Sequence, residues 1–230
     1  MSRLLVHAVG SAEATTGRDR GLGGRALRWV RSGRLGAWAT VWEGAPSALG
    51  RDELLAHHRL VEELSPCLPV RFGTWAADEA ALAGLLRARE RELLGALARV
   101  EGRRELAVTA LWRRPLAAES AAEPHGGGPG RRFLERRGEA WRERARREAL
   151  AGELAARLDE TLELPPSAVQ HRRCPSETVA LSSAFLVAAD RAAALGERLR
   201  AVGEVFPEVQ LLVHGPWPPY SFVGNVEGEN

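Results

Sequence analysis

Alternating apolar and polar residues predict a β-hairpin near the start of the chain, followed by a helix and a short strand. The hairpin covers residues 26–42 and turns at Gly33, where glycine adopts a positive φ without strain. Apolar side chains then recur at helical spacing over residues 51–64, with His58 on the apolar stripe beside Leu54, Val61 and Leu64. The short apolar strand covers residues 68–72.

The same order of elements recurs in the second half of the sequence. A second hairpin is predicted over residues 169–187, Asp190 caps a helix that extends to Val202, and a strand covers residues 209–213. A split β-α-β arrangement of the ferredoxin type fits each copy. We therefore expect an α+β protein with two domains, each a small sheet with helices, ferredoxin-like or a modified form of it.

Two further segments have the apolar periodicity of longer helices. Asp78 is a suitable N-cap for the first, which extends to about Val100. Its buried stripe is predicted to consist of Leu82, Leu85, Leu86, Leu93 and Leu97. The second helix covers residues 132–163 and has two apolar faces, one in each half, formed by Leu134, Trp141 and Ala145 and by Leu150, Leu154, Leu158 and Leu162. This helix is expected either to serve two cores or to bend.

Domain boundaries are predicted from a segment without apolar periodicity. Residues 115–131 are rich in Ala, Gly and Pro and contain Gly126-Gly127-Gly128-Pro129-Gly130, which is typical of a mobile linker. The strand predicted at residues 105–112 precedes this linker. We therefore assign residues 1–114 to an N-terminal domain and residues 132–230 to a C-terminal domain.

Composition and charge exclude several classes of protein. The formal net charge is only +2, which argues against a nucleic-acid binder driven by overall charge. No apolar run reaches the length of about 18 residues that a membrane span needs, so we expect a cytoplasmic protein with no membrane partner. Cys67 and Cys174 lack the spacing of a metal site, and free thiols are the expected state.

No set of residues indicates catalysis or a bound cofactor. His57 and His58 are adjacent on a helix and diverge by about 100°, so they cannot share a ligand face. His58 is instead interpreted as a hydrogen-bonded packing residue. The glycine-rich loops lack the lysine of a phosphate-binding loop, since the chain contains no lysine. We predict no catalytic, cofactor or metal residues.

Arg71 and Phe72, in the segment PVRFGT, are candidate structural or partner-contact residues. In a strand, Arg71 should point away from the face that carries Phe72. Two readings remain open for this arginine: a solvated strand face, or an ion pair with Glu62, Glu63 or a partner protein.

The segment GPWPPYSF near the C-terminus combines three prolines with three aromatic residues. The prolines restrict the backbone, and Trp217, Tyr220 and Phe222 supply aromatic area, which suits packing or recognition. We call residues 216–222 the C-terminal arm. It is predicted to be ordered against the protein body and to fix the relative position of the two domains. Exposed aromatic side chains would instead form a partner-binding hot spot.

Taken in order, these motifs resemble the gas vesicle protein L/F family. The resemblance rests on the opening strand LLVHAVG, the segment LPVRFGT, the Phe-Leu-Glu step that opens the second long helix, and above all GPWPPYSF. It covers nearly the whole chain.

The resemblance implies a non-catalytic accessory protein of gas vesicle assembly, associated with gas vesicles. Such a protein would bind the small hydrophobic shell protein, and other accessory proteins as further candidate partners, and keep the shell protein soluble or deliver it to the growing vesicle. The alternatives are a minor component that stays on the finished vesicle and a small enzyme with a site between the domains.

Overall fold

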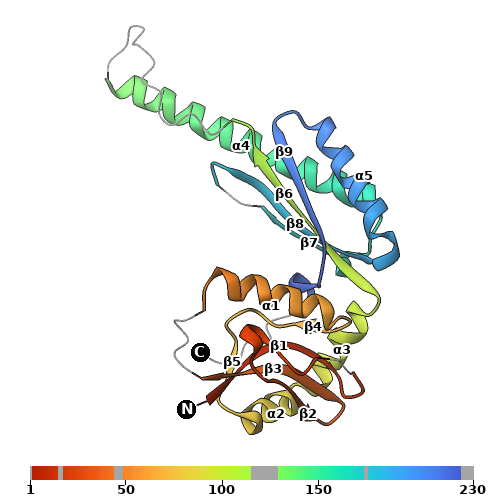
Figure 1. Cartoon of the computed structure of the whole chain (residues 1–230). Coiled ribbons are helices and arrows are strands. Elements are labelled where there is room, and N and C mark those ends of the chain that lie inside the picture. Colours follow the sequence, from red (N-terminus) through yellow and green to blue (C-terminus); the bar gives the residue numbers. More distant parts are fainter. Residues whose placement is uncertain (1, 15–17, 44–48, 115–128, 174–175, 224–230) are drawn as a thin grey trace. The chain divides into compact units, whose positions relative to one another are not determined.

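The computed structural model describes residues 2–14, 18–43, 49–114, 129–173 and 176–223. The chain forms two compact units: Met1–Glu105 together with Pro216–Asn230, and Leu106–Gly215. Each unit contains one β-sheet flanked by helices, as Figure 1 shows. The expected two-domain α+β fold is thus confirmed, and the units are described one at a time.

The sheet of the first unit has the strand order β2-β3-β1-β4, and a fifth strand, β5, also pairs with β1. Its strands are β1 (Ser2–Ser11), β2 (Leu27–Ser32), β3 (Leu35–Glu43), β4 (Leu68–Pro69) and β5 (Trp75–Ala76). All recorded pairings are antiparallel, and the predicted hairpin turns at Gly33, whose φ is +60°.

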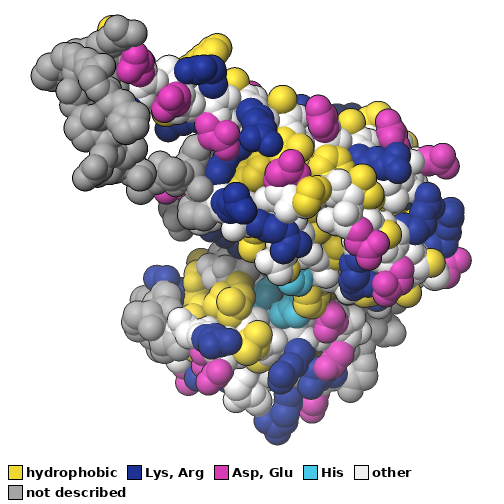
Figure 2. All heavy atoms as spheres, turned by 90° about the horizontal axis from the view of Figure 1, so that it is seen from above, with side chains coloured by type: hydrophobic (Ala, Val, Ile, Leu, Met, Phe, Trp, Pro, Cys, Tyr) yellow, Lys and Arg dark blue, Asp and Glu magenta, His cyan; other side chains and the backbone are white. Residues whose placement is uncertain are grey.

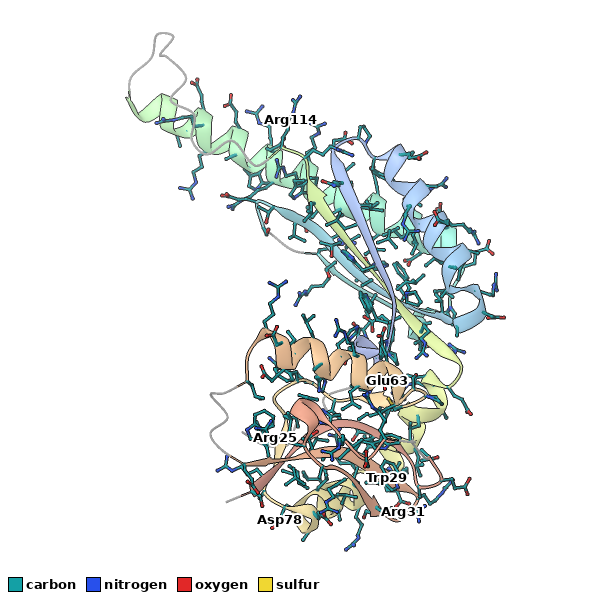
Figure 3. The ribbon with its side chains drawn as sticks, viewed as in Figure 1. Arg25, Trp29, Arg31, Glu63, Asp78 and Arg114 are labelled. Atoms are coloured by element: carbon teal, nitrogen blue, oxygen red, sulfur yellow. The ribbon has the colours of Figure 1, made fainter. Side chains whose placement is uncertain are left out.

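Helix α1 (Arg51–Glu63) covers one face of this sheet, while α2 (Glu79–Ala88) and α3 (Glu90–Val100) lie on the opposite side (Figure 1). Asp78, labelled in Figure 3, caps α2 as predicted. Its carboxylate accepts a hydrogen bond of 2.7 Å from the Ala81 N–H. The short 3₁₀ helix η1 (Leu22–Gly24) packs against α1. Next to η1, the guanidinium of Arg25 lies 3.9 Å from the centroid of the Trp42 ring.

A β-bulge in β1 determines which side chains face α1. Val6 pairs with Ala39 and Ala8 with Trp38, so His7 is an extra residue in β1. After such a bulge the side-chain alternation shifts by one residue. Leu5 and Ala8 consequently belong to the same apolar cluster under α1.

The second unit has the order of elements β-α-β-β-α-β. Its strands and helices are β6 (Arg103–Trp112), α4 (Pro129–Leu162), β7 (Val169–Arg173), β8 (Val179–Ala188), α5 (Ala192–Val205) and β9 (Val209–Trp217). The strand order β7-β8-β6-β9 is that of a ferredoxin-like sheet. One apolar cluster joins β6, β8, α4 and α5, with Leu158, Leu181 and Leu199 fully buried.

The first unit follows the same plan in modified form. Its strands β2-β3-β1-β4 repeat the order β7-β8-β6-β9, and α1 corresponds to α5. Between its first two strands the first unit has η1 where the second unit has α4. The repeat inferred from the two hairpin-helix-strand patterns therefore exists, and it includes a preceding strand in each unit.

The observed units differ from the predicted domains in two respects. β6 is an inner strand of the second sheet, whereas the sequence analysis placed it in the first domain because it precedes the glycine-rich segment. The C-terminal arm, assigned to the second domain, belongs to the first unit. The glycine-rich segment connects β6 to α4 within the second unit. Its residues 115–128 lie outside the described residues, and α4 begins at Pro129.

Several predicted helical details are wrong. The segment predicted as one helix after Asp78 breaks at Arg89 into α2 and α3, so one continuous stripe does not form: Leu85 is 43% exposed, whereas Leu82, Leu86 and Leu93 are buried. Helix α5 extends to Val205 and receives no side-chain cap, because Asp190 lies within the short 3₁₀ helix η4 (Ala189–Arg191).

Candidate functional site

The C-terminal arm packs onto the first unit. Pro218, Pro219 and Phe222 are buried, Trp217 and Tyr220 are half-buried, and the arm ends in the 3₁₀ helix η5 (Tyr220–Phe222). The apolar cluster beneath α1 includes Tyr220 among its partly buried members. The expectation that the arm is ordered against the protein therefore agrees with the structure of this unit.

His58 of α1 is the main contact of the arm's aromatic rings. Its ring centroid lies 4.7 Å from that of Trp217, edge to face, and 6.1 Å from that of Tyr220, nearly parallel. Within the part of the chain that the structure describes, the buried His58 Nε2 has no hydrogen-bond partner, and the Glu62 Oε1 atom is 3.9 Å away. His58 is thus a packing residue, as interpreted, but it is held by aromatic contacts, and the hydrogen bond expected for it is not formed at Nε2.

A buried carboxylate fixes the end of the arm. Glu105, only 6% exposed, accepts two hydrogen bonds of 2.8 Å from Ser221, one from the backbone N–H and one from the side-chain hydroxyl. Burial raises the pKa of Glu105, and the two hydrogen bonds from Ser221 partly oppose this shift because they favour the charged form. Ser221 therefore ties the arm to the first residues of β6.

Beneath α1, a second histidine takes the buried position that the pattern had assigned to His58. His57 is 2% exposed, and its Nδ1 lies 2.9 Å from Nδ1 of His7, a fully buried residue at the β1 bulge. His57 Nε2 lies 3.1 Å from the Val70 carbonyl oxygen, and His7 Nε2 lies 2.6 Å from the Thr40 hydroxyl. These contacts form one chain of hydrogen bonds, which we call the histidine network.

The directions of these hydrogen bonds follow from the ends of the network. The Val70 carbonyl can only accept, so His57 Nε2 carries a proton and the neutral His57 Nδ1 accepts one from His7 Nδ1. His7 Nε2 then accepts from the Thr40 hydroxyl, which itself accepts the Leu22 N–H at 3.1 Å. In the neutral form, both nitrogens of each imidazole therefore have a hydrogen-bond partner.

Protonation of His57 at Nδ1 would replace its hydrogen bond to His7 with two opposed donors. Burial and, to a lesser extent, the neighbouring His57 together lower the pKa of His7 to about 3. Burial also lowers the pKa of His57 to about 4, against the opposing effect of its hydrogen bond to Val70. The histidine network therefore joins β1, β3, α1, η1 and the end of β4 through neutral rings.

Arg71 and Phe72 lie in a turn and not in a strand. β4 ends at Pro69, and the Arg71 carbonyl accepts hydrogen bonds from the Thr74 N–H and hydroxyl, with Gly73 at a φ of +87°. The predicted strand 68–72 is thus wrong in its second half. The Phe72 ring packs edge-on against His57 with centroids 5.3 Å apart, whereas the Arg71 side chain is exposed.

The site brings together three of the five candidate residues through two adjacent histidines. Phe72 contacts His57, and Trp217 and Tyr220 contact His58. Phe222 is buried at the end of the same arm. The sequence analysis missed His7, because its partner is 50 residues away in the chain. The one signal in the sequence that could have indicated His7 is its position within an apolar strand predicted to be buried.

The site has no feature of a metal centre or a reactive thiol. Among the described residues, no group of three or more His, Cys, Asp or Glu side chains could hold a metal ion. Burial raises the pKa of Cys67 to about 12, so its thiol stays protonated at neutral pH. No helix among the described residues combines the length and hydrophobicity needed to cross a membrane. This arrangement packs an aromatic arm and a neutral histidine pair, and it suits a protein that presents a surface.

Fold and site together define a protein of two ferredoxin-like units, the first of them modified and closed by an aromatic arm. The family described as gas vesicle synthesis protein GvpL/GvpF matches residues 4–224, and the chain belongs to this family. Gas vesicle protein L from Streptomyces sp. (strain CB03234) is 30% identical over 234 residues, covering 90% of this chain and 86% of that protein.

Two crystal structures have the same fold. Gas vesicle protein GvpF from Anabaena sp. PCC7120 matches with a TM-score of 0.73 at 16% sequence identity, over 97% of this chain and 98% of that one. GvpF from Microcystis aeruginosa matches with a TM-score of 0.71 at 13% identity, over 96% and 98%. Family membership supports an involvement with gas vesicles.

Proposed function

We propose that the protein is a non-catalytic accessory factor of gas vesicle assembly that binds the small hydrophobic shell protein and keeps it soluble or delivers it during vesicle formation. The observation that supports this proposal most directly is an exposed apolar pair on α1. Leu54 is 47% exposed and Leu55 is 45% exposed, on the same helix whose His58 holds the C-terminal arm.

The buried side of α1 keeps this pair in a fixed position. His57 is held by the histidine network, and His58 is held by Trp217 and Tyr220. A rigid apolar surface loses little conformational entropy when it binds an apolar partner. In this proposal the arm orients α1 and need not touch the shell protein itself.

The charge distribution favours apolar over electrostatic recognition. Figure 2 shows basic and acidic side chains interspersed on the visible face, with hydrophobic side chains between them. Over the whole sequence, basic and acidic residues also nearly cancel, since the formal net charge is only +2. Because a surface of mixed sign does not steer a charged partner strongly, contact area is the more effective source of affinity here.

Co-expression with the shell protein tests the proposal. The wild-type chain should retain the shell protein in the soluble fraction and in a pull-down, whereas the double substitution Leu54→Glu and Leu55→Glu should lose both, with an unchanged melting temperature. Leu85→Glu is the matched control, since Leu85 is equally exposed at 43% but lies on α2. Loss of capture in the Leu85 variant alone would move the binding surface to α2, and retention in all variants would refute an apolar contact on α1.

The alternative is a minor component that remains on the finished vesicle. Intact vesicles washed with urea would separate the two roles, because a transient factor is removed and a structural component remains bound. Retention of this chain after the wash would refute the accessory role in favour of the structural one.

A further inference from the structure

The first half of α4 carries apolar side chains that the described structure leaves uncovered. With 34 residues, α4 is about 50 Å long, and only its second half supplies the buried Leu154, Leu158 and Leu162. In Figure 1 the first half of α4 extends beyond the sheet of its own unit. On this half, Leu134 is 68% exposed and Trp141 is 71% exposed. Neither of the two cores that the sequence analysis considered for this helix covers them.

These side chains belong to one narrow stripe. At about 100° per residue, Leu134, Gly138, Trp141 and Ala145 fall within about 60° of one another around the helix. We call these four residues the α4 stripe. They alternate in size along the helix: large, small, large, small.

Among the described residues, no contact within the chain requires a glycine at position 138, whose carbonyl accepts a hydrogen bond of 3.2 Å from Arg142 Nε as that of any residue could. An added Cβ at this position would have only the Arg142 Nη2 atom nearby, at 3.9 Å. A glycine in the middle of a helix destabilises it relative to alanine. The lack of a side chain one turn from an exposed tryptophan therefore favours an external contact that needs the space above Gly138.

We propose that the α4 stripe is a contact between two copies of this chain, whose α4 helices pair antiparallel about a two-fold axis at the level between Glu139 and Ala140. In this arrangement Trp141 of each copy lies level with Gly138 of the other, and Leu134 lies level with Ala145. Each large side chain therefore meets a small one, in both halves of the contact. An isologous contact requires this self-complementarity.

The charged residues beside the α4 stripe add no net attraction or repulsion between the two copies, so the apolar contact determines the association. Along one edge of the pair, Arg142 of each copy comes within about 3 Å of helix rise of Glu135 in the other. Along the other edge, Arg137 and Arg144 of different copies come equally close, and these like charges repel. Because the two edges oppose each other, the association should change little with salt, whereas binding of an acidic partner would weaken steeply.

The contact area predicts a weak dimer. Each tryptophan can bury about 150–250 Å², so the whole contact amounts to about 600–800 Å², below the roughly 1,200 Å² of a stable interface. Association should therefore become visible only above about 100 µM protein. Sedimentation velocity of the full chain from about 10 to 500 µM, at low and high salt, measures it directly.

Two substitutions test the stripe in opposite ways. Trp141→Ala removes the large side chain, and Gly138→Leu fills the space that Trp141 of the other copy would occupy. Both substitutions should therefore abolish the increase in average mass with protein concentration. Gly138→Leu should also leave the melting temperature equal or higher, since leucine favours helix more than glycine does. Gly95→Leu is the matched control, because Gly95 also lies in a helix, is exposed and has open space around an added Cβ.

Disulfide cross-linking tests the antiparallel register in a Cys174→Ser background. A mixture of Leu134→Cys and Ala145→Cys chains should form a mixed disulfide dimer, whereas either chain alone should not, because its two cysteines would lie about 16 Å apart along the helices. Preferential like-with-like cross-links would refute the antiparallel pairing. A monomeric wild-type chain at 500 µM, or an association that survives Gly138→Leu, would overturn the proposal.

Discussion

The histidine network makes the stability of the first unit depend on pH from about 6.5 down to the folded-state pKa values of about 4 for His57 and about 3 for His7. Both histidines have folded-state pKa values, about 3 for His7 and about 4 for His57, that lie below the ordinary value of 6.5. Their stabilising contribution is thus fully present above pH 6.5. It is lost as the pH falls, because the unfolded chain then binds protons that the native network excludes.

The size of this pH effect on the free energy of unfolding follows from the two protons that the native network excludes. Each excluded proton costs about 1.4 kcal/mol per pH unit, so the free energy of unfolding should fall by up to about 2.7 kcal/mol per unit below pH 6. At pH 5 each histidine then contributes a loss of about 2 kcal/mol relative to pH 7. Glu105 acts in the opposite direction, since its raised pKa favours the native state below its ordinary value and this benefit disappears as the pH rises.

Comparison with a variant separates the histidine effect from that of Glu105. His57→Gln retains a donor for the Val70 carbonyl but removes one titrating ring, so the slope between pH 6 and pH 5 should fall by about half. Urea unfolding followed by tryptophan fluorescence is a suitable assay, because five of the seven tryptophans belong to the first unit. His214→Gln, in the second unit, is the matched control and should keep the wild-type slope.

A wild-type slope near zero would refute the assignment of two neutral buried histidines. An unchanged slope in His57→Gln would show that the pH dependence comes from other groups.

Three further predictions concern the same unit, each measured by urea unfolding at pH 7. Leu86→Ala should destabilise it by about 2–5 kcal/mol, whereas Leu85→Ala, 43% exposed one residue earlier, should cost under about 1 kcal/mol; equal losses would contradict the observed orientation of α2. Glu105→Gln should cost about 1–3 kcal/mol, since an amide cannot accept both hydrogen bonds from Ser221, and no loss would mean that the arm is held by its aromatic residues alone. Trp217→Ala should cost about 1–3 kcal/mol, because it removes half-buried aromatic contact with His58, and an unchanged stability together with lost shell-protein binding would make the arm the contact surface.

The local patterns of the sequence predicted most of the elements, because hairpins, caps and helix ends depend on near neighbours. The turn at Gly33 and the cap at Asp78 are both determined within a few residues. The assignment of β6 to the second sheet was not accessible in this way. A strand's sheet is decided by its pairing partners, and those of β6 are β8 and β9, far along the chain.

For the candidate site, the sequence identified the aromatic arm but not the residues it contacts. The apolar periodicity placed Leu54, Val61 and Leu64 on the buried side of α1, and His58 lies on the same stripe. The native helix instead turns His57 inward, where hydrogen bonds to His7 and Val70 compensate for its burial. Such compensation depends on partners from other strands, which no local pattern reveals.

Assignment of the C-terminal arm to the first unit has a consequence for synthesis on the ribosome. The second unit is complete once Gly215 has been made, whereas the first unit, begun at the N-terminus, lacks its last segment until Phe222 has emerged. Domains generally fold as units when their chain is complete. The nascent first unit therefore waits with His58 and the aromatic cluster beneath α1 uncovered while the whole second unit is synthesised. During that interval it has the greatest need of a chaperone, and emergence of the C-terminal arm is the step that completes the first unit.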